Sequence, residues 1–363
     1  MTASETTYAS FRTLKIPAQV TCLAAGGAGQ LTVGSDDGSV RIYDLSTLKV
    51  VKAIRGLASV SSVVWQPQNA SQPDCLWLAS GRSVVAFTMD TDKMILTMSD
   101  AHLKLEVGSG DDDAVNELTM NKNGSQVAFC LDSGVVGVIN LCNNEVSRMR
   151  NGHGTVCGSV RFVPNRPGEL VSGGYNSTLL HFDILQSKLL SQDDLPPSGI
   201  SIGAMAPSSG LAMSPPFILS LDISPTGVLA AGTADGRIYV GTSGEAGAGG
   251  GRQNRRRKWE GLRSDGRILQ EVAQGPVTAL AFTSPRELLT CTLLGSVASH
   301  EICGPVSNGG QLTIRSTWNR NAGDIFKVNA MVVWFQKDGA GVIEIWEEMG
   351  TTGADLSTKI NCE

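Results

Sequence analysis

Apolar and polar positions alternate along the chain in short runs that are separated by glycine-containing turns. Residues 31–45 (LTVGSDDGSVRIYDL) form one such unit: an apolar run, a turn that contains Asp37, and an alternating run that ends on Tyr43 and Asp44. Alternation with a period of two places successive side chains on opposite faces of a strand, and Asp-Gly is a strong hairpin signal. The segment therefore predicts two antiparallel strands joined by a tight turn.

The same unit recurs, seven times in all. In chain order the copies end on Tyr43-Asp44, Phe87-Thr88, Ile139-Asn140, Phe182-Asp183, Gly241-Thr242, His300-Glu301 and Trp346-Glu347. Another short apolar strand, such as VTCLAA or GSVRFV, precedes each copy. The steps between copies are 44, 52, 43, 59, 59 and 46 residues. A period of about 40–45 residues, ending on an aromatic residue and Asp, resembles the WD repeat, whose four strands form one propeller blade. We therefore expect an all-β protein, a single seven-bladed β-propeller of degenerate WD repeats.

The repeat pattern also predicts how the chain is organised. FRTLKI, residues 11–16, precedes the first repeat and is expected to close the ring as the outer strand of the last blade. Two insertions lengthen the longest steps, and the stretch around GSGDDD (108–113) lengthens a third. The expected parts are a flexible N-terminus (1–10), the propeller (11–349) with loops at about 191–216 and 243–262, and a C-terminal tail (350–363).

WD repeats carry a Gly-His near the repeat start and an Asp in the central turn, which together form a buried polar network with the Trp-Asp strand. Here only Gly152-His153 keeps the first feature, so His153 is interpreted as structural rather than as a catalytic base. Since such networks stabilise only when every member is paired, most blades are expected to rest on packing alone. The expected structural positions are Asp37, Tyr43, Asp44, His153, Phe182, Asp183, Asp235 and Trp346.

The second half of the chain resembles one WD subfamily, WD repeat-containing protein 53. The resemblance lies in SVRFVPNRPGELVSGG (159–174), in PPFILSLDISPTGVLAAGTADGRIYV (215–240) and in the KVN that begins at Lys327. It implies a substrate receptor of cullin-RING ubiquitin ligases, which binds an adaptor on one face and a client on another. Many such receptors have Arg two positions after the Asp of the Trp-Asp pair. This chain departs from that pattern, with Ser46 after Asp44 and Leu185 after Asp183.

Composition narrows the class of protein further. Charged residues make up 17% of the chain, there are 42 glycines, and the net charge is -5. This charge argues against a general nucleic-acid binder, which is usually basic. The eight cysteines contain no C-x-x-C pair and mostly lie in apolar runs, so we expect reduced thiols in the cytoplasm or the nucleus. The sequence shows neither a signal peptide nor an apolar run of about 20 residues, so no membrane partner is expected.

Two charged segments are candidates for partner binding. Asp111, Asp112 and Asp113 lie together beside glycines and either attract a cation or basic peptide or form a solvated acidic loop. The stretch 244–261 has a glycine run followed by Arg252, Arg255, Arg256, Arg257, Lys258 and Trp259. That run suggests a nuclear-import signal, a phosphate contact or a clamp for an acidic partner, with a solvated outer-hairpin loop as the alternative.

Catalytic motifs are absent from the sequence. There is no P-loop, no H-E-x-x-H and no G-x-S-x-G, and the four histidines lack metal-ligand spacing. We therefore expect no catalytic residues, no metal and no cofactor. The leading hypothesis is a non-catalytic scaffold, monomeric on its own, that binds other proteins and acts as a ubiquitin-ligase receptor. The alternatives are a chromatin- or nucleic-acid-associated propeller that uses residues 252–258, and an enzyme with a site built from convergent loops.

Overall fold

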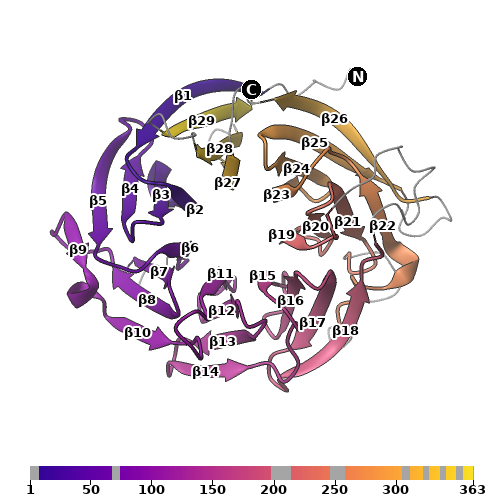
Figure 1. The fold of residues 1–363 in the computed structure, drawn as a ribbon, viewed down its shortest axis with the longest axis horizontal. Coiled ribbons are helices and arrows are strands. Elements are labelled where there is room, and N and C mark those ends of the chain that lie inside the picture. Colours follow the sequence, from indigo (N-terminus) through magenta and orange to yellow (C-terminus); the bar gives the residue numbers. More distant parts are fainter. Residues whose placement is uncertain are drawn as a thin grey trace. The chain divides into compact units, whose positions relative to one another are not determined.

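Antiparallel β-sheets make up nearly all the regular structure (Figure 1). The computed structural model describes residues 8–67, 74–197, 214–245, 258–304, 311–321, 327–335, 341–348 and 355–362. Short 3-10 turns cover Gly27–Gly29, Met98–Asp100 and Ser264–Gly266. No helix in these ranges is long and apolar enough to cross a membrane. The all-β class predicted from the sequence is confirmed. The chain divides into two compact units, unit 1 (Met1–Val115, Leu293–Val297 and Trp318–Glu363) and unit 2 (Asn116–Thr292 and Ala298–Thr317).

Unit 1 contains three sheets. The first has the order β2-β3-β4-β5-β9: Val20–Gly26, Gln30–Ser35, Val40–Asp44, Lys49–Arg55 and Ile95–Thr97. The second has the order β10-β8-β7-β6: Leu103–Glu106, Ser83–Thr88, Cys75–Ser80 and Val60–Trp65. The third has the order β1-β29-β28-β27: Tyr8–Ile16, Asp355–Cys362, Gly341–Glu348 and Lys327–Phe335.

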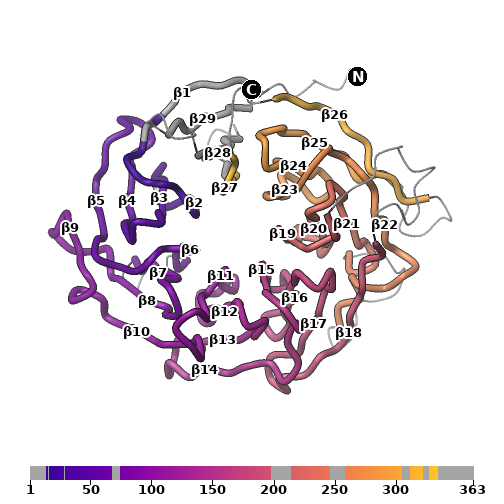
Figure 2. The backbone as a smooth tube through the Cα atoms, in the orientation of Figure 1, coloured from indigo at the N-terminus to yellow at the C-terminus, as the bar shows by residue number. Residues whose placement is uncertain are grey.

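Unit 2 contains three four-stranded sheets and the greater part of a fourth. The first is β11 to β14: Val115–Met120, Gln126–Leu131, Val136–Asn140 and Glu145–Arg148. The second is β15 to β18: Cys157–Phe162, Glu169–Gly174, Thr178–Asp183 and Lys188–Asp194. The third is β19 to β22: Ile218–Ile223, Leu229–Thr233, Arg237–Gly241 and Arg267–Glu271. The fourth is β23 to β26: Val277–Ser284, Glu287–Thr292, Ser296–Cys303 and Thr313–Asn321. In Figure 2 the backbone of unit 2 passes through four consecutive strands before it enters the next sheet.

The second strands β3, β7, β12, β16, β20 and β24 are buried on both faces, which explains their continuous apolar runs. All six residues of β7 are buried, and so are five of the six in β12 and in β17. Apolar side chains of neighbouring sheets pack together: one cluster joins β16 and β17 to β19–β22, and it includes Leu179, Leu221 and Tyr239. A single sheet cannot bury both of its faces, so each sheet depends on its neighbours for stability.

Polar side chains on the first strands add a second kind of link between sheets. In unit 2 Asn116 Nδ2 donates to the Cys157 carbonyl (3.0 Å), and Ser220 Oγ donates to the Val277 carbonyl (3.2 Å). In unit 1 Asn329 Nδ2 donates in the same way to the carbonyl of Val20 (2.8 Å). The expectation that most blades rest on packing alone is therefore wrong, because these bonds use polar groups outside the WD network.

Charged side chains also connect the first strands of unit 2. Glu117 on β11 accepts from the Val160 N–H (2.8 Å) and lies 2.7 Å from Arg161 Nη1 on β15. Asp222 on β19 accepts from the Phe282 N–H on β23 (2.9 Å), and its other oxygen lies 3.9 Å from Arg161 Nε. These side chains are roughly a quarter exposed. Arg161 thus lies between two carboxylates, and its ion pairs link the sheets that begin with β11, β15 and β19.

The chain's first and last strands lie in one sheet. β1 pairs antiparallel with β29, with Ile16 opposite Asp355, and forms the sheet edge. Residues 11–16 therefore take the outer position expected for them, whereas 355–362, expected to be part of a tail, form a strand. The closed ring and the number of blades stay predictions.

An insertion after β8 explains part of the 52-residue step. It supplies β9, which pairs in parallel with β5 of the preceding sheet, and Ala53 lies opposite Ile95. Lys52 Nζ donates to the carbonyls of Met89 (2.7 Å) and Thr91 (2.6 Å) and holds the insertion in place. The spacing attributed the extra residues to the stretch around GSGDDD (108–113). Some of them instead form β9 and extend the preceding sheet.

Candidate partner-binding surfaces

His153 lies at the centre of a closed polar network. Its Nε2 is 2.7 Å from Ser172 Oγ and its Nδ1 is 3.0 Å from Asn176 Oδ1. A serine, a histidine and an amide in this order also describe a nucleophile, its base and an orienting group. However, Ser172 is 0% exposed and His153 only 5% exposed, so a substrate has no access to the hydroxyl. The arrangement supports a structural role for His153, with Phe182 fully buried where a WD repeat has tryptophan.

The two aspartates of the Asp-Gly turns, Asp235 and Asp37, differ in how far their side chains are buried. Asp235 is buried, accepts from Thr233 Oγ1 (2.5 Å) and pairs with Arg237 Nε (2.6 Å). Arg237 also donates to the Pro196 carbonyl (2.7 Å). Asp37 accepts from the Ser39 N–H (3.0 Å), but its side chain is 44% exposed. The same Asp-Gly turn therefore gives a buried ion pair in one sheet and a surface turn in another.

The terminal positions of the repeat act mainly in packing and in turn capping. Tyr43 is buried, and Asp44 Oδ1 accepts from the backbone N–H groups of Ser46 (2.8 Å) and Thr47 (3.0 Å). Asp183 Oδ1 accepts from the Gln186 N–H (2.9 Å) in the same manner. These carboxylates satisfy the backbone of the turn that follows the third strand.

The assignment of Trp346 to the Trp-Asp position is wrong. Trp346 lies on β28, which is the second strand of its sheet, between β27 and β29. Residues 341–348 alternate as either a second or a third strand would, so the pattern alone does not distinguish the two positions. The fifth repeat is shifted as well: Leu229 pairs with Gly241, so the terminal pair is Val240-Gly241 rather than Gly241-Thr242.

The three acidic residues of the 108–113 stretch do not converge. Asp111 is exposed and pairs with Arg82 Nη1 (2.7 Å), whereas Asp113 turns inward and accepts from the Ser109 N–H (2.9 Å). Asp112 is exposed. Within the described ranges, no group of three or more His, Cys, Asp or Glu side chains is placed to hold a metal ion. The geometry supports an acidic turn that is closed by Ser109 and Asp113 and is held by Arg82.

The basic segment lies only partly within the described residues. Arg252, Arg255, Arg256 and Arg257 lie outside them. Lys258 is exposed, and its Nζ donates to the Leu190 carbonyl (3.3 Å). The segment's start is held as well, since Glu245 forms a two-fold contact with Arg286 (3.1 and 2.6 Å).

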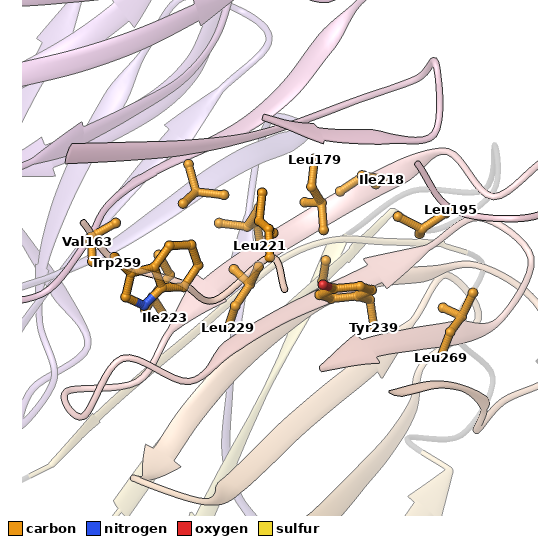
Figure 3. Close-up of a cluster of buried hydrophobic side chains, with 13 residues drawn as sticks. Val163, Leu179, Leu195, Ile218, Leu221, Ile223, Leu229, Tyr239, Trp259 and Leu269 are labelled. Carbon is orange, nitrogen blue, oxygen red and sulfur yellow. The ribbon is translucent and has the colours of Figure 1, made fainter. Parts of the chain in front are cut away.

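Trp259 is a core residue and not the exposed aromatic that the sequence suggested. It is 3% exposed, and its Nε1 donates to the Gly227 carbonyl (3.0 Å). Figure 3 shows its indole beside Val163 and Ile223 in the apolar cluster. A Cβ atom at Gly244 would lie 1.9 Å from the indole nitrogen, and one at Gly261 only 1.8 Å from a ring carbon. These two glycines let the backbone on either side of the basic segment close around the ring.

Glu169 attaches Trp259 to the β15–β18 sheet. Its Oε2 accepts from the Trp259 N–H (3.0 Å) and lies 2.9 Å from Nε2 of the buried His181. Burial raises the pKa of the Glu169 carboxyl, but hydrogen bonds from His181, Trp259 and Arg166 outweigh this effect, and the net pKa is lowered. The carboxylate is thus ionised at neutral pH and fixes the end of the basic segment.

The burial of His300 predicts that the stability of unit 2 depends on pH. It is 2% exposed, its Nε2 lies 3.0 Å from Thr290 Oγ1, and burial lowers its pKa from 6.5 to about 4. Between these pH values His300 is protonated in the unfolded chain but remains neutral in the folded chain. The free energy of unfolding therefore falls as the pH decreases from 6.5 toward 4. The loss from this residue is about 3 kcal/mol.

We expect His300→Gln to remove most of this dependence. Urea unfolding of both proteins at pH 7 and pH 4.5 measures it, since carboxyl groups contribute equally to the two. If the free energy of unfolding fell equally with pH in the variant and the parent chain, His300 would take up its proton as readily in the folded state as in the unfolded state, and the prediction would be wrong.

Two exposed side chains at opposite ends of β17 were not predicted from the sequence. Leu185, in the turn after β17, is 88% exposed. Tyr175, in the turn before it, is 37% exposed. A leucine in a turn and a tyrosine beside Gly174 carry no signal in the sequence that would show them to be exposed. Leu185 occupies the position at which many ligase receptors have Arg. The turn that carries Leu185 lies at the same end of the β15–β18 sheet as Glu169, which binds the Trp259 backbone. The two coincide because Glu169 on β16 pairs with Asp183 at the end of β17.

Comparisons with known proteins confirm the resemblance to WD repeats. Residues 10–44 match the family model described as WD domain, G-beta repeat. The chain is also similar to WD repeat-containing protein 53 homolog of Dictyostelium discoideum, with 25% identity over 235 residues. This match covers 61% of the chain and 61% of that protein, so the chain spans less than two thirds of the relative. WD-repeat proteins are generally non-catalytic scaffolds for protein interaction.

Proposed function

We propose that this chain is a non-catalytic scaffold that binds proteins, and that it serves as a substrate receptor of a cullin-RING ubiquitin ligase. One observation carries the proposal: buried polar groups bond to one another inside the sheets, while the most exposed large apolar side chain of the described residues, Leu185, lies on a turn. Ser172 and His153 are enclosed, whereas Leu185 is 88% exposed. Such a distribution favours binding by the turns over chemistry by the interior.

The end of the β15–β18 sheet that carries Leu185 is the proposed adaptor surface. Asp183 fixes the turn by accepting from the Gln186 N–H, so Leu185 is held outward on an ordered backbone. Lys258, where the basic segment ends, attaches to the same sheet through the Leu190 carbonyl. An apolar side chain next to positive charge suits a partner whose surface is apolar with an acidic rim.

The receptor role differs from the resemblance in one respect. Ser46 and Leu185 replace the arginines that many ligase receptors carry at these positions. Leucine retains an apolar contact but gives up the bidentate hydrogen bonds of a guanidinium. We therefore propose adaptor binding through burial of Leu185, with the basic segment supplying the positive charge.

Size-exclusion chromatography of the purified chain with the purified ligase adaptor tests this proposal. We expect the two to co-elute, and Leu185→Asp to weaken binding about tenfold or more, because it places a charge in an apolar contact. Leu294→Asp is the matched control, since Leu294 is 61% exposed on a turn between β24 and β25, and it should bind as the parent chain does. Separate elution of folded chain and adaptor would remove the receptor role.

A further inference from the structure

Two stacked aromatic side chains lie at the end of β17 opposite to Leu185. Tyr175 occupies the turn between β16 and β17, and Phe217 directly precedes β19. Their rings are nearly parallel, with centroids 5.4 Å apart and 11° between the planes. Tyr175 remains 37% exposed, so stacking leaves part of its ring open to solvent. We refer to Tyr175 and Phe217 as the aromatic platform.

Backbone contacts hold the platform in place without a ligand. The Tyr175 N–H donates to the Val156 carbonyl (2.9 Å), and the Ala234 N–H donates to the Phe217 carbonyl (2.9 Å). Gly158 lies close to the Tyr175 ring, because a Cβ atom there would approach Cε1 to 3.1 Å. Both rings are thus attached to sheets, and little conformational entropy remains to be lost on binding.

A carboxylate is linked to the platform through Asn116, whose Nδ2 also donates to the carbonyl of Cys157 (3.0 Å), the residue before Gly158. Asp132 is in the turn between β12 and β13, and its Oδ1 accepts from Asn116 Nδ2 (3.0 Å). The pKa of Tyr175 is raised, first by burial of the phenol and then by the negative charge of Asp132. Among the residues that the structure describes, no cationic side chain forms an ion pair with Asp132.

We infer that the aromatic platform and Asp132 bind an arginine side chain of a partner protein. A guanidinium stacks on an aromatic ring while its N–H groups donate to a carboxylate, and its weak hydration makes this transfer easier than for lysine. The neighbouring insertion does not supply the cation, because residues 198–213 contain no lysine or arginine. Lys258 is held at the opposite end of the sheet by Trp259 and Glu169.

This inference rests on the proposed scaffold function and deepens it. The adaptor surface lies at the Leu185 end of β17, and the aromatic platform lies at its other end, five residue steps away along Thr178–Asp183. At about 3.3 Å per residue the two ends are roughly 16 Å apart, which is far enough for separate partners. The client of the receptor would therefore present an arginine in an extended segment.

Fluorescence polarisation with degenerate peptides tests the inference. The probes are labelled nonapeptide pools whose fixed central residue is arginine, lysine or glutamine. We expect the arginine pool to bind the full chain at least fivefold more tightly than the other two. Tyr175→Ala should weaken binding about fivefold, and Asp132→Asn about tenfold with a flatter salt dependence, since stacking and the charged hydrogen bond are lost separately.

Two controls keep the outcome clear. Tyr175→Phe retains the stack and should bind as the parent chain does, whereas Leu185→Asp alters only the other end and should leave peptide binding unchanged. Tyr175→Ala should still co-elute with the ligase adaptor, which separates failure of this inference from failure of the receptor role. Equal binding of the three pools, or unchanged binding by folded Tyr175→Ala, would overturn the arginine site.

Discussion

Replacing Asp235 with alanine is expected to lower the free energy of unfolding by about 3–5 kcal/mol, because it leaves the buried Arg237 guanidinium without its carboxylate. Both side chains are nearly inaccessible, with 0% of Asp235 and 4% of Arg237 exposed. A single domain is stable by only about 5–15 kcal/mol, so the variant should lose a large part of its stability. Urea unfolding followed by tryptophan fluorescence measures the change.

Asp37→Ala is the matched control for this effect. Asp37 occupies the same position of its Asp-Gly turn and approaches Arg41 to 3.6 Å, but it is 44% exposed. Since exposed ion pairs contribute about 0–1 kcal/mol, its removal should change little. A double variant, Asp235→Leu with Arg237→Met, should recover much of the stability, because the uncompensated charge is gone. Similar small losses for Asp235→Ala and Asp37→Ala would contradict the burial of the Asp235–Arg237 pair.

Replacing Trp259 with alanine should cost about 3–5 kcal/mol, because it empties the centre of the cluster formed with Val163, Leu221 and Ile223. Trp259→Phe should cost less, about 1–2 kcal/mol, since the ring volume is largely kept and only the bond to the Gly227 carbonyl is lost. Lys258→Ala changes the exposed neighbour and should shift the free energy of unfolding by less than about 0.5 kcal/mol.

The same variants distinguish a core role for Trp259 from a binding role. If Trp259 contacted a partner, Trp259→Ala would weaken partner binding and leave the unfolding midpoint unchanged. Differential scanning calorimetry of the three variants, alongside adaptor binding by those that remain folded, separates these outcomes.

The repeat pattern predicts the strands well because it depends on local alternation and turn residues. The first strands and their hairpins appear where the sequence places them, and residues 11–16 lie at the sheet edge beside β29. Trp346 could not be assigned from the pattern, since a second and a third strand with two buried faces have the same alternation. Residues 355–362 were predicted as a tail because nothing in their own sequence shows that they pair with β1.

Residues of the candidate surfaces were harder to predict because burial depends on distant segments. Asp37 and Asp235 share a turn sequence, yet only Asp235 is covered, with Arg237 reaching the Pro196 carbonyl. Trp259 follows four arginines and looks exposed until Gly244, Gly261 and Glu169 enclose it. Tyr175 and Phe217 belong to different repeats and meet only through sheet packing.

Quantitative affinity purification from cells tests the central claim that this chain works by binding proteins. The tagged parent chain should reproducibly retain a defined set of proteins that includes the ligase adaptor. Leu185→Asp should lose the adaptor, and Tyr175→Ala should lose a client while keeping the adaptor. Recovery of the folded parent chain alone, with no protein enriched over the tag control in any replicate, would contradict the scaffold function.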